Sequence, residues 1–246
     1  EQPGRPFLYA TTARFLQYLG LETLADLLER LAPARLDGLE PWFPHVTPNK
    51  LTPALAMQVR RLLAARGMTV CACAGSVGDP EHNPDGTEEC FLVARMLQAP
   101  LIAAHMSLAT IPHLAPFCHR HGVRIGFENG HEGSAEEILA ALSGGGDWLG
   151  ANLDTGNLAA QGGDPVEAVR LLGRRINHVH LKDVPAIGAH ECVALGAGIV
   201  DVAGVLRELK ASGYDGWLSI EIETGDHDPT DEIIASAETV RRLWGR

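Results

Sequence analysis

The strongest constraint in this sequence is a regular alternation between short apolar runs and longer amphipathic stretches. The apolar runs have the length of β-strands, and they recur at roughly the 30-residue spacing of one strand–helix unit. Eight runs occur along the chain, at residues 7–12, 36–41, 68–74, 101–106, 123–129, 148–154, 176–182 and 217–223. Few folds accommodate eight such units in 246 residues.

The stretches between the apolar runs carry helix signals. Apolar residues return at helical spacing within residues 21–31, 55–62, 202–209 and 233–244. Thr52 and Asp164 each precede a proline, which is typical of a helix N-cap. Ser134 and Glu137 have the spacing of a capping box, so we expect another helix to begin there.

Alternating strands and helices predict parallel strands that are joined by crossover helices. Eight units predict an α/β fold, a closed (β/α)₈ TIM barrel, as a single domain spanning residues 1–246. A doubly wound open sheet is the alternative, and it would favour a glycine-rich loop between a strand and a helix. The glycines at 144–146 instead follow a helical stretch and precede a strand, which favours the barrel.

The composition restricts the partners and the setting. The chain has 20 Lys and Arg against 31 Asp and Glu, and its net charge of −11 disfavours nucleic acid as a partner. No apolar run approaches the roughly 20 residues of a membrane span. The five cysteines form no C-x-x-C pair, and together with their odd number this favours a reducing, cytoplasmic location. A homo-oligomer stays open.

Polar residues share one face of the later strands. Strand side chains alternate between two faces, so the apolar positions should meet the helices and the polar ones should line the barrel. Four residues on the polar face end successive predicted strands, namely Glu128, Asp154, His180 and Glu221. The carboxyl ends of barrel strands are where barrel enzymes build their sites.

Ionised groups inside a barrel are costly unless they are paired or bind a metal. Three carboxylates and one imidazole suit one divalent ion, and they do not choose among Mn²⁺, Mg²⁺, Co²⁺ and Zn²⁺. The alternative is four unrelated polar residues at loop entrances. Two further strand ends, Glu40 and His105, point to the same rim by parity and are predicted substrate contacts.

Five segments carry a resemblance to a known family. They are GFENGHEG (126–133), NLDTGN (152–157), HVHLKD (178–183), LGAGIVD (195–201) and GYDGWLSIEIE (213–223). In these segments the chain resembles the xylose isomerase-like TIM barrel family, which includes sugar phosphate isomerases and epimerases. The resemblance implies a divalent metal held by Glu128, Asp154, His180 and Glu221.

The same resemblance suggests roles for the neighbouring residues. It implies that Glu128 and Glu221 exchange the substrate proton, and that His131, Asn157, Lys182 and Glu223 bind the substrate. Asn157 stands where many family members have His, which argues against a role that needs a titrating imidazole there. By its parity, Asp183 is expected to anchor the following loop, and His178 to pack beneath His180.

The predicted reaction is the isomerisation or epimerisation of a ketose or related keto-polyol. It would proceed by proton abstraction next to a carbonyl, through an enediolate that the metal stabilises. The alternative is a lyase that dehydrates a keto-sugar or inosose with the same metal site. A nuclease is disfavoured by Asn157 and by the negative charge, and a non-catalytic binding barrel by the intact ligand set.

Overall fold

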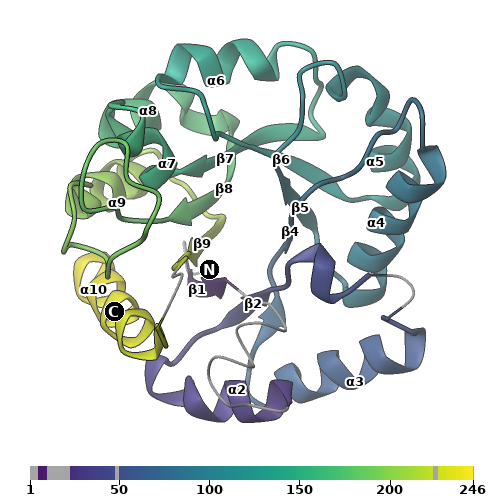
Figure 1. Ribbon diagram of the computed structural model, residues 1–246, viewed down its shortest axis with the longest axis horizontal. Coiled ribbons are helices and arrows are strands. Elements are labelled where there is room, and N and C mark those ends of the chain that lie inside the picture. Colours follow the sequence, from purple (N-terminus) through teal and green to yellow (C-terminus); the bar gives the residue numbers. More distant parts are fainter. Residues whose placement is uncertain (1–4, 10–22, 48–49, 224–226, 246) are drawn as a thin grey trace.

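The computed structural model describes residues 5–9, 23–47, 50–223 and 227–245. These residues form the predicted α/β barrel, in which a ring of parallel strands lies inside a ring of helices (Figure 1). That the whole chain, residues 1–246, makes one domain stays a prediction, because some residues lie outside the described ranges.

The strands are β1 (Arg5–Tyr9), β2 (Gly38–Glu40), β3 (Thr69–Val70), β4 (Cys73–Ala74), β5 (Leu101–Ala104), β6 (Arg124–Glu128), β7 (Leu149–Asp154), β8 (Ile176–Leu181) and β9 (Trp217–Ile220). The α-helices are α2 (Leu24–Arg30), α3 (Pro53–Ala64), α4 (Pro84–Leu97), α5 (Ala115–His121), α6 (Ala135–Leu142), α7 (Thr155–Ala160), α8 (Pro165–Leu172), α9 (Val202–Ala211) and α10 (Thr230–Trp244). The 3₁₀ turns are η1 (Ala32–Ala34), η2 (Phe43–His45), η3 (Ile111–His113) and η4 (Gly173–Arg175).

One interrupted run of residues closes the ring of strands. The hydrogen-bonded order is β3-β2-β1-β9-β8-β7-β6-β5-β4, and every pair is parallel. β3 and β4 are the two halves of the run predicted at 68–74, where residues 71–72 interrupt the strand. Because this run pairs with β2 at its start and with β5 at its end, the sheet closes with the eight predicted strand positions.

Several strands are shorter than their apolar runs predicted. β5 ends at Ala104 and β9 at Ile220, so His105 and Glu221 lie just beyond the regular ladder. The backbone N–H of Glu221 still donates to the carbonyl of Leu181, which keeps the strand direction for one more residue. Residues 10–12 of the first predicted strand and Leu21 of the first predicted helix lie outside the described ranges.

The helices begin where their capping residues predicted. The side chain of Thr52 accepts from the N–H of Leu55, and that of Asp164 accepts from Val166 and Glu167. Ser134 caps α6, but the Glu137 carboxylate accepts from the N–H of Gly133, so the reciprocal bond of the predicted capping box is shifted by one residue. None of the described helices is long and apolar enough to cross a membrane.

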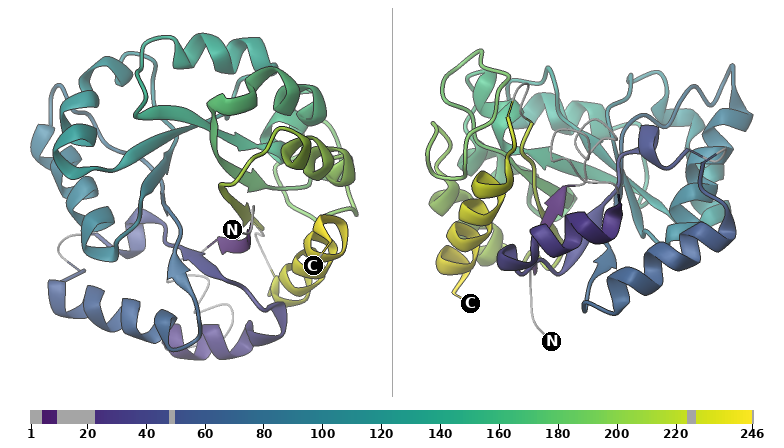
Figure 2. Two further views of the ribbon diagram at one scale, coloured as in Figure 1. Left: turned by 180° about the vertical axis from the view of Figure 1, so that it is seen from behind. Right: turned by 60° about the horizontal axis from the view of Figure 1, so that its bottom comes forward.

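The two faces of the strands separate apolar from polar groups, as predicted. The helices surround the ring in both views of Figure 2. The apolar positions of β8 and β9 are buried against this layer, for example Val179, Leu181 and Leu218. The opposite positions place His178, His180 and Ser219, all buried, on the polar face that lines the interior.

The stagger between neighbouring strands brings the strand ends together. Asp154 pairs directly with His180 across β7 and β8. Glu128 pairs instead with Asn152, two positions before Asp154 in β7, and His180 pairs with Ser219, two positions before Glu221. Such stagger is a consequence of the tilt that closes a barrel. It allows residues that are not direct cross-strand partners to meet at the ends of the strands.

Candidate metal centre

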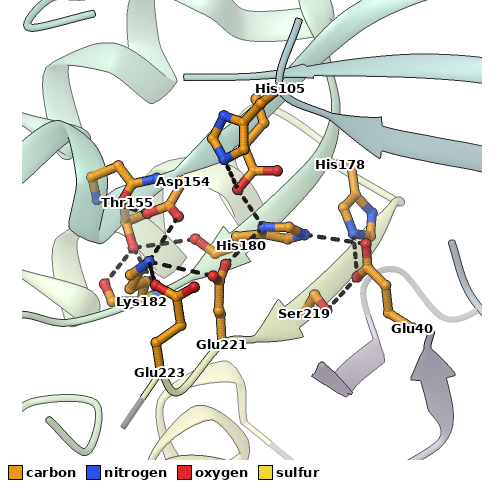
Figure 3. Close-up of polar contacts among 12 residues, drawn as sticks. Glu40, His105, Asp154, Thr155, His178, His180, Lys182, Ser219, Glu221 and Glu223 are labelled. Carbon is orange, nitrogen blue, oxygen red and sulfur yellow. Dashed lines mark hydrogen bonds and ion pairs between the residues drawn. The ribbon is translucent and has the colours of Figure 1, made fainter. Parts of the chain in front are cut away.

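Four side chains meet at the carboxyl end of the barrel. Glu128 ends β6, Asp154 ends β7, His180 lies in β8, and Glu221 follows β9. Each offers one donor atom, and these atoms all lie within 4.8 Å of one another. Figure 3 shows Asp154, His180 and Glu221 of this group. All four residues are buried. We call this group the outer cluster, and the convergence predicted from strand parity is confirmed.

The imidazole of His180 is the centre of this arrangement. Its Nδ1 lies 2.8 Å from Oε2 of Glu221 and 3.2 Å from Oε1 of Glu128. Its Nε2 lies on the other side of the ring, 3.2 Å from Oε1 of Glu40. Nδ1 is therefore the ring nitrogen that faces the outer cluster.

Two oxygen atoms of the outer cluster are buried without a hydrogen-bond partner, Oδ2 of Asp154 and Oε2 of Glu221. Lys182 Nζ is 3.7 Å from Oδ2, and His180 Nδ1 forms an ion pair with Oε2 at 2.8 Å. Buried carboxylate oxygens without partners are costly. A divalent cation would remove this cost, and an oxygen-rich set with one imidazole fits Mn²⁺, Mg²⁺, Co²⁺ or Zn²⁺.

Asp154 is held in place by its own backbone surroundings. Its Oδ1 accepts from the N–H of Asn157 at 2.7 Å and caps α7, which leaves Oδ2 for the outer cluster. The Asn129 side chain exchanges two hydrogen bonds with the Asp154 backbone, each at 2.9 Å. Asn129 was not among the residues predicted from the sequence, although a polar residue directly after Glu128 was a signal for it.

Lys182 supplies a positive charge beside the carboxylates. Its Nζ lies 3.3 Å from Oε1 of Glu221 and 2.6 Å from Oε2 of Glu223. Its stem packs against Gly156, where any Cβ would collide with it. The Thr155 hydroxyl donates to the Lys182 carbonyl at 2.7 Å and accepts from the Lys182 N–H at 3.0 Å. This role of Thr155 was also not predicted from the sequence.

The carboxylates of the outer cluster differ in acidity. Burial raises the pKa of Asp154 to about 7, with the Lys182 charge opposing the rise and the charges of Glu221 and Glu128 adding to it. Burial also acts on Glu128, but the charges and hydrogen bonds of His180 and His105 outweigh it and hold its pKa below the usual range. The pKa of Glu221 is lowered in the same way, by Lys182 and His180 against burial. Glu128 and Glu221 are therefore ionised at neutral pH.

The positively charged partners are held in their protonated forms. Burial would lower the pKa of Lys182, but the charges of Glu221, Asp154 and Glu223 raise it above its usual range. His105 lies at the rim with 55% of its side chain exposed, and its Nε2 is 3.2 Å from Oε1 of Glu128. The hydrogen bond to Glu128 raises the pKa of His105 to about 8, against the effect of burial.

The predicted substrate contacts differ in how closely they approach the outer cluster. Lys182 and His105 touch the outer cluster, and Glu223, whose side chain is 60% exposed, reaches it through Lys182. Asn157 touches it through its N–H to Asp154, and its side chain donates to the Asn129 carbonyl. His131 is exposed on the segment between β6 and α6.

Glu40 lies in the buried interior of the barrel. Its side chain is completely buried, and it bonds to His178, His180 and Ser219 in the barrel interior (Figure 3). This placement argues against the substrate contact predicted for it, because strand parity gives the direction of a side chain and not its depth. We call Glu40, His178 and Ser219 the inner cluster. His178 packs beneath His180 as predicted, with the ring centroids 5.3 Å apart.

Asp183 anchors the loop after β8, as predicted. Its carboxylate accepts from the backbone N–H groups of Val184, Gly196, Gly198 and Val200, at 2.9–3.0 Å. These four bonds fold the segment back onto the end of β8. Lys182, the residue before Asp183, is thereby held at the mouth of the barrel.

The chain is similar to curated proteins over part of its sequence. It aligns with the inosose dehydratase of Geobacillus thermodenitrificans at 34% identity over 110 residues, which cover 37% of this chain and 37% of that protein. The alignments with the first curated relatives cover 32% and 37% of those proteins, so the chain spans about a third of their length.

Two solved structures share the fold over nearly the whole chain. A D-tagatose 3-epimerase-like protein aligns with a TM-score of 0.77 at 19% identity, covering 98% of this chain and 97% of that one. The IOLI protein, whose structure contains a zinc atom, aligns with a TM-score of 0.77 at 16% identity, covering 98% of each chain. At such identities the likeness concerns the fold alone.

A family model adds the sequence evidence. The model described as xylose isomerase-like TIM barrel matches residues 108–243, which is more than half of the chain. The matched region contains all four residues of the outer cluster. The chain therefore belongs to the xylose isomerase-like TIM barrel family.

Proposed function

We propose that this chain is a divalent-metal-dependent enzyme that removes a proton next to the carbonyl of a ketose or keto-polyol. The outer cluster carries the proposal, because four donor atoms converge within 4.8 Å and two of the carboxylate oxygens there lack hydrogen bonds. When bound, Mn²⁺, Mg²⁺, Co²⁺ or Zn²⁺ would supply Lewis-acid stabilisation of the negative charge of an enediolate.

In this proposal Glu128 and Glu221 exchange the substrate proton. Both are ionised at neutral pH, and they come from different strands of the ring. One carboxylate removes the proton from carbon and later releases it to water, and the other takes up a proton from water and donates it to carbon. Return to the opposite face of the same carbon inverts a stereocentre, whereas return to the neighbouring carbon interconverts aldose and ketose.

The surroundings favour an uncharged substrate. The outer cluster holds three carboxylates, and Glu223 adds a fourth beside it. Among the described residues, the cations in contact with these groups are Lys182 and imidazoles, with no arginine. A phosphate would meet these carboxylates, so a neutral sugar fits better. We propose His105, His131, Asn157, Lys182 and Glu223 as its contacts.

A dehydratase is the second candidate, and the placement of two proton donors favours it. Lys182 is held as an ammonium beside Glu221, and His105 is protonated at neutral pH beside Glu128. His105 can donate a proton to a hydroxyl that leaves as water, and Lys182 can donate a hydrogen bond to it. The likeness to inosose dehydratase gives the same direction, and the initial proton abstraction is common to both reactions.

The proposed setting is the cytoplasm. All five cysteines are free thiols, which suits a reducing compartment. The identity of the metal and a homo-oligomeric state stay predictions.

The decisive experiment exposes the metal-loaded protein to ketoses and inososes in D₂O and follows each by NMR. Deuterium uptake at one carbon of a sugar that keeps all its hydroxyl groups would identify an isomerase or epimerase. Loss of water with formation of a conjugated enone would identify the dehydratase. Metal binding without exchange or product for any substrate of the panel would contradict the proposal.

Two variants assign the exchange to the outer cluster. Glu128→Gln and Glu221→Gln should each slow deuterium uptake by roughly 10²–10⁴-fold, the usual contribution of a positioned acid or base. Glu136→Gln is the matched control, because Glu136 is exposed on α6 and should leave the rate unchanged. Wild-type exchange rates in both cluster variants would refute their assignment.

A further inference from the structure

The inner cluster forms a closed set of hydrogen bonds around Glu40. Oε2 of Glu40 accepts from Nε2 of His178 at 2.9 Å and from the Ser219 hydroxyl at 2.5 Å. Its Oε1 accepts from Nε2 of His180 at 3.2 Å. Glu40, Ser219 and His180 are fully buried, and His178 is 1% exposed. These bonds therefore form away from water, where they are strongest.

We propose that Glu40 is a positioning residue that selects which ring nitrogen of His180 faces the outer cluster. A carboxylate only accepts hydrogen bonds, so the His180 nitrogen that faces Glu40 must carry the hydrogen. That nitrogen is Nε2. Nδ1 also faces carboxylates, those of Glu128 and Glu221, so without a metal it carries a hydrogen as well. When the outer cluster binds a cation, Nδ1 would give up that hydrogen and offer its lone pair, while Glu40 keeps the hydrogen on Nε2. This role rests on the proposed metal function of the outer cluster.

The other bonds of Glu40 explain why it can hold the ring. His178 and Ser219 fix the second carboxylate oxygen, so Glu40 has little freedom to turn away from His180. Glu40 comes from β2, and the two histidines come from β8, 138 and 140 positions later in the chain. The first half of the barrel thereby orients a candidate ligand that belongs to the second half. Partners of this kind, behind metal-binding histidines, set the tautomer and the ring angle.

A second metal ion is the competing explanation for the same residues. Donor atoms of Glu40, His178 and His180 also lie within 4.8 Å of one another. Two observations favour the hydrogen-bonded reading. Both Glu40 oxygens already accept hydrogen bonds. In addition, His180 would have to lose both ring hydrogens to bind one ion through each nitrogen.

The first experiment uses the wild-type protein labelled with ¹⁵N-histidine, before and after saturation with Zn²⁺. We expect one zinc per chain, a zinc-shifted Nδ1 of His180, and a hydrogen retained on its Nε2. Zinc on Nε2, or two zinc ions per chain, would overturn the role of Glu40. These spectra need no variant, so they decide the question even if substitutions in the interior prevent folding.

The second experiment compares zinc affinities by competition with a chelator. Glu40→Ala should weaken zinc binding by roughly 10- to 100-fold, the usual effect of removing such a partner. Glu40→Asp keeps a carboxylate and should recover part of the loss. Ser219→Ala is the matched control, since it removes one bond to Glu40 and leaves the Glu40 carboxylate beside His180, and its loss of affinity should be several-fold smaller.

The outcomes separate this inference from the proposed function. A folded Glu40→Ala protein with wild-type zinc affinity would overturn the role of Glu40 and leave the metal centre intact. No zinc binding by the wild-type protein would contradict the metal centre itself, and the role of Glu40 with it.

Discussion

The outer and inner clusters lie on opposite sides of one imidazole, and they differ in whether their buried carboxylate oxygens accept hydrogen bonds. In the inner cluster, both oxygens of Glu40 accept hydrogen bonds. In the outer cluster, Oδ2 of Asp154 and Oε2 of Glu221 accept none. Buried polar groups are nearly always satisfied, and an unsatisfied one asks for a reason. We infer that the inner cluster is completed by the fold, and that the outer cluster is completed by a ligand.

This comparison predicts opposite effects of neutral substitutions in the two clusters. Removing a charge from the outer cluster should relieve repulsion in the metal-free protein and destroy metal binding. Removing a hydrogen bond from the inner cluster should weaken the fold with or without metal. Each of the following variants tests one side of that contrast.

The largest effect is expected from Asp154→Asn. A free metal concentration of a thousand times Kd raises the free energy of unfolding by about 4 kcal/mol. The variant should lose most of this gain. Without metal it should be more stable than wild type at pH 8, because the cost of ionising the buried Asp154 carboxyl is removed. Asparagine is also a good N-cap, so α7 should survive. Urea unfolding with and without Zn²⁺ measures both effects.

The pH dependence gives the sign of the metal-free effect. The pKa of Asp154 is about 7 in the folded protein, above its value in an unfolded chain. Ionisation therefore penalises the folded state progressively from about pH 4 to about pH 7. The advantage of Asp154→Asn should be absent below this window and complete above it. Asp147→Asn, at an exposed position, is the control, and an equal pH profile there would contradict the argument.

The next effect belongs to the inner cluster. Ser219→Ala removes a buried hydrogen bond to a carboxylate and should lower the free energy of unfolding by about 1–3 kcal/mol. The loss should be similar with and without Zn²⁺, because Ser219 bonds to Glu40 and is not itself one of the donors of the outer cluster. Thermal unfolding measures it, with the exposed Ser143→Ala as control. A stabilised variant would show that the inner cluster is strained and not satisfied.

The sequence predicted the outer cluster because its signals are local. Alternation along a strand tells which side chains face inward, and the end of an apolar run tells which of them lie at the mouth. Both signals were present for Glu128, Asp154 and His180 in β6, β7 and β8. The eight apolar runs likewise predicted the ring itself.

The inner cluster was beyond such reasoning, because it depends on the register between distant strands. Glu40 faces inward by parity, but the pairing of β2, β1, β9 and β8 decides that it meets His178 and His180. The helix α7 was also missed, since six residues are too few to show a helical period. Its capping residue, Asp154, was identified only as a metal ligand.

The smallest effect is expected at the rim, where solvent weakens the contrast between the clusters. The pKa of His105 is raised to about 8 by Glu128, so this pair stabilises the metal-free protein fully below about pH 6.5, and the gain is lost as the pH rises through 8. Because His105 is largely exposed, His105→Asn should cost only a few tenths of a kcal/mol at pH 6.

With Zn²⁺ bound, the carboxylate charge is neutralised and the cation repels the imidazolium, so the same variant should be neutral or stabilising. Paired unfolding curves at pH 6 and pH 9, with and without Zn²⁺, measure this reversal. A cost that is unchanged by zinc would mean that Glu128 stays a partner of His105 and not of the metal.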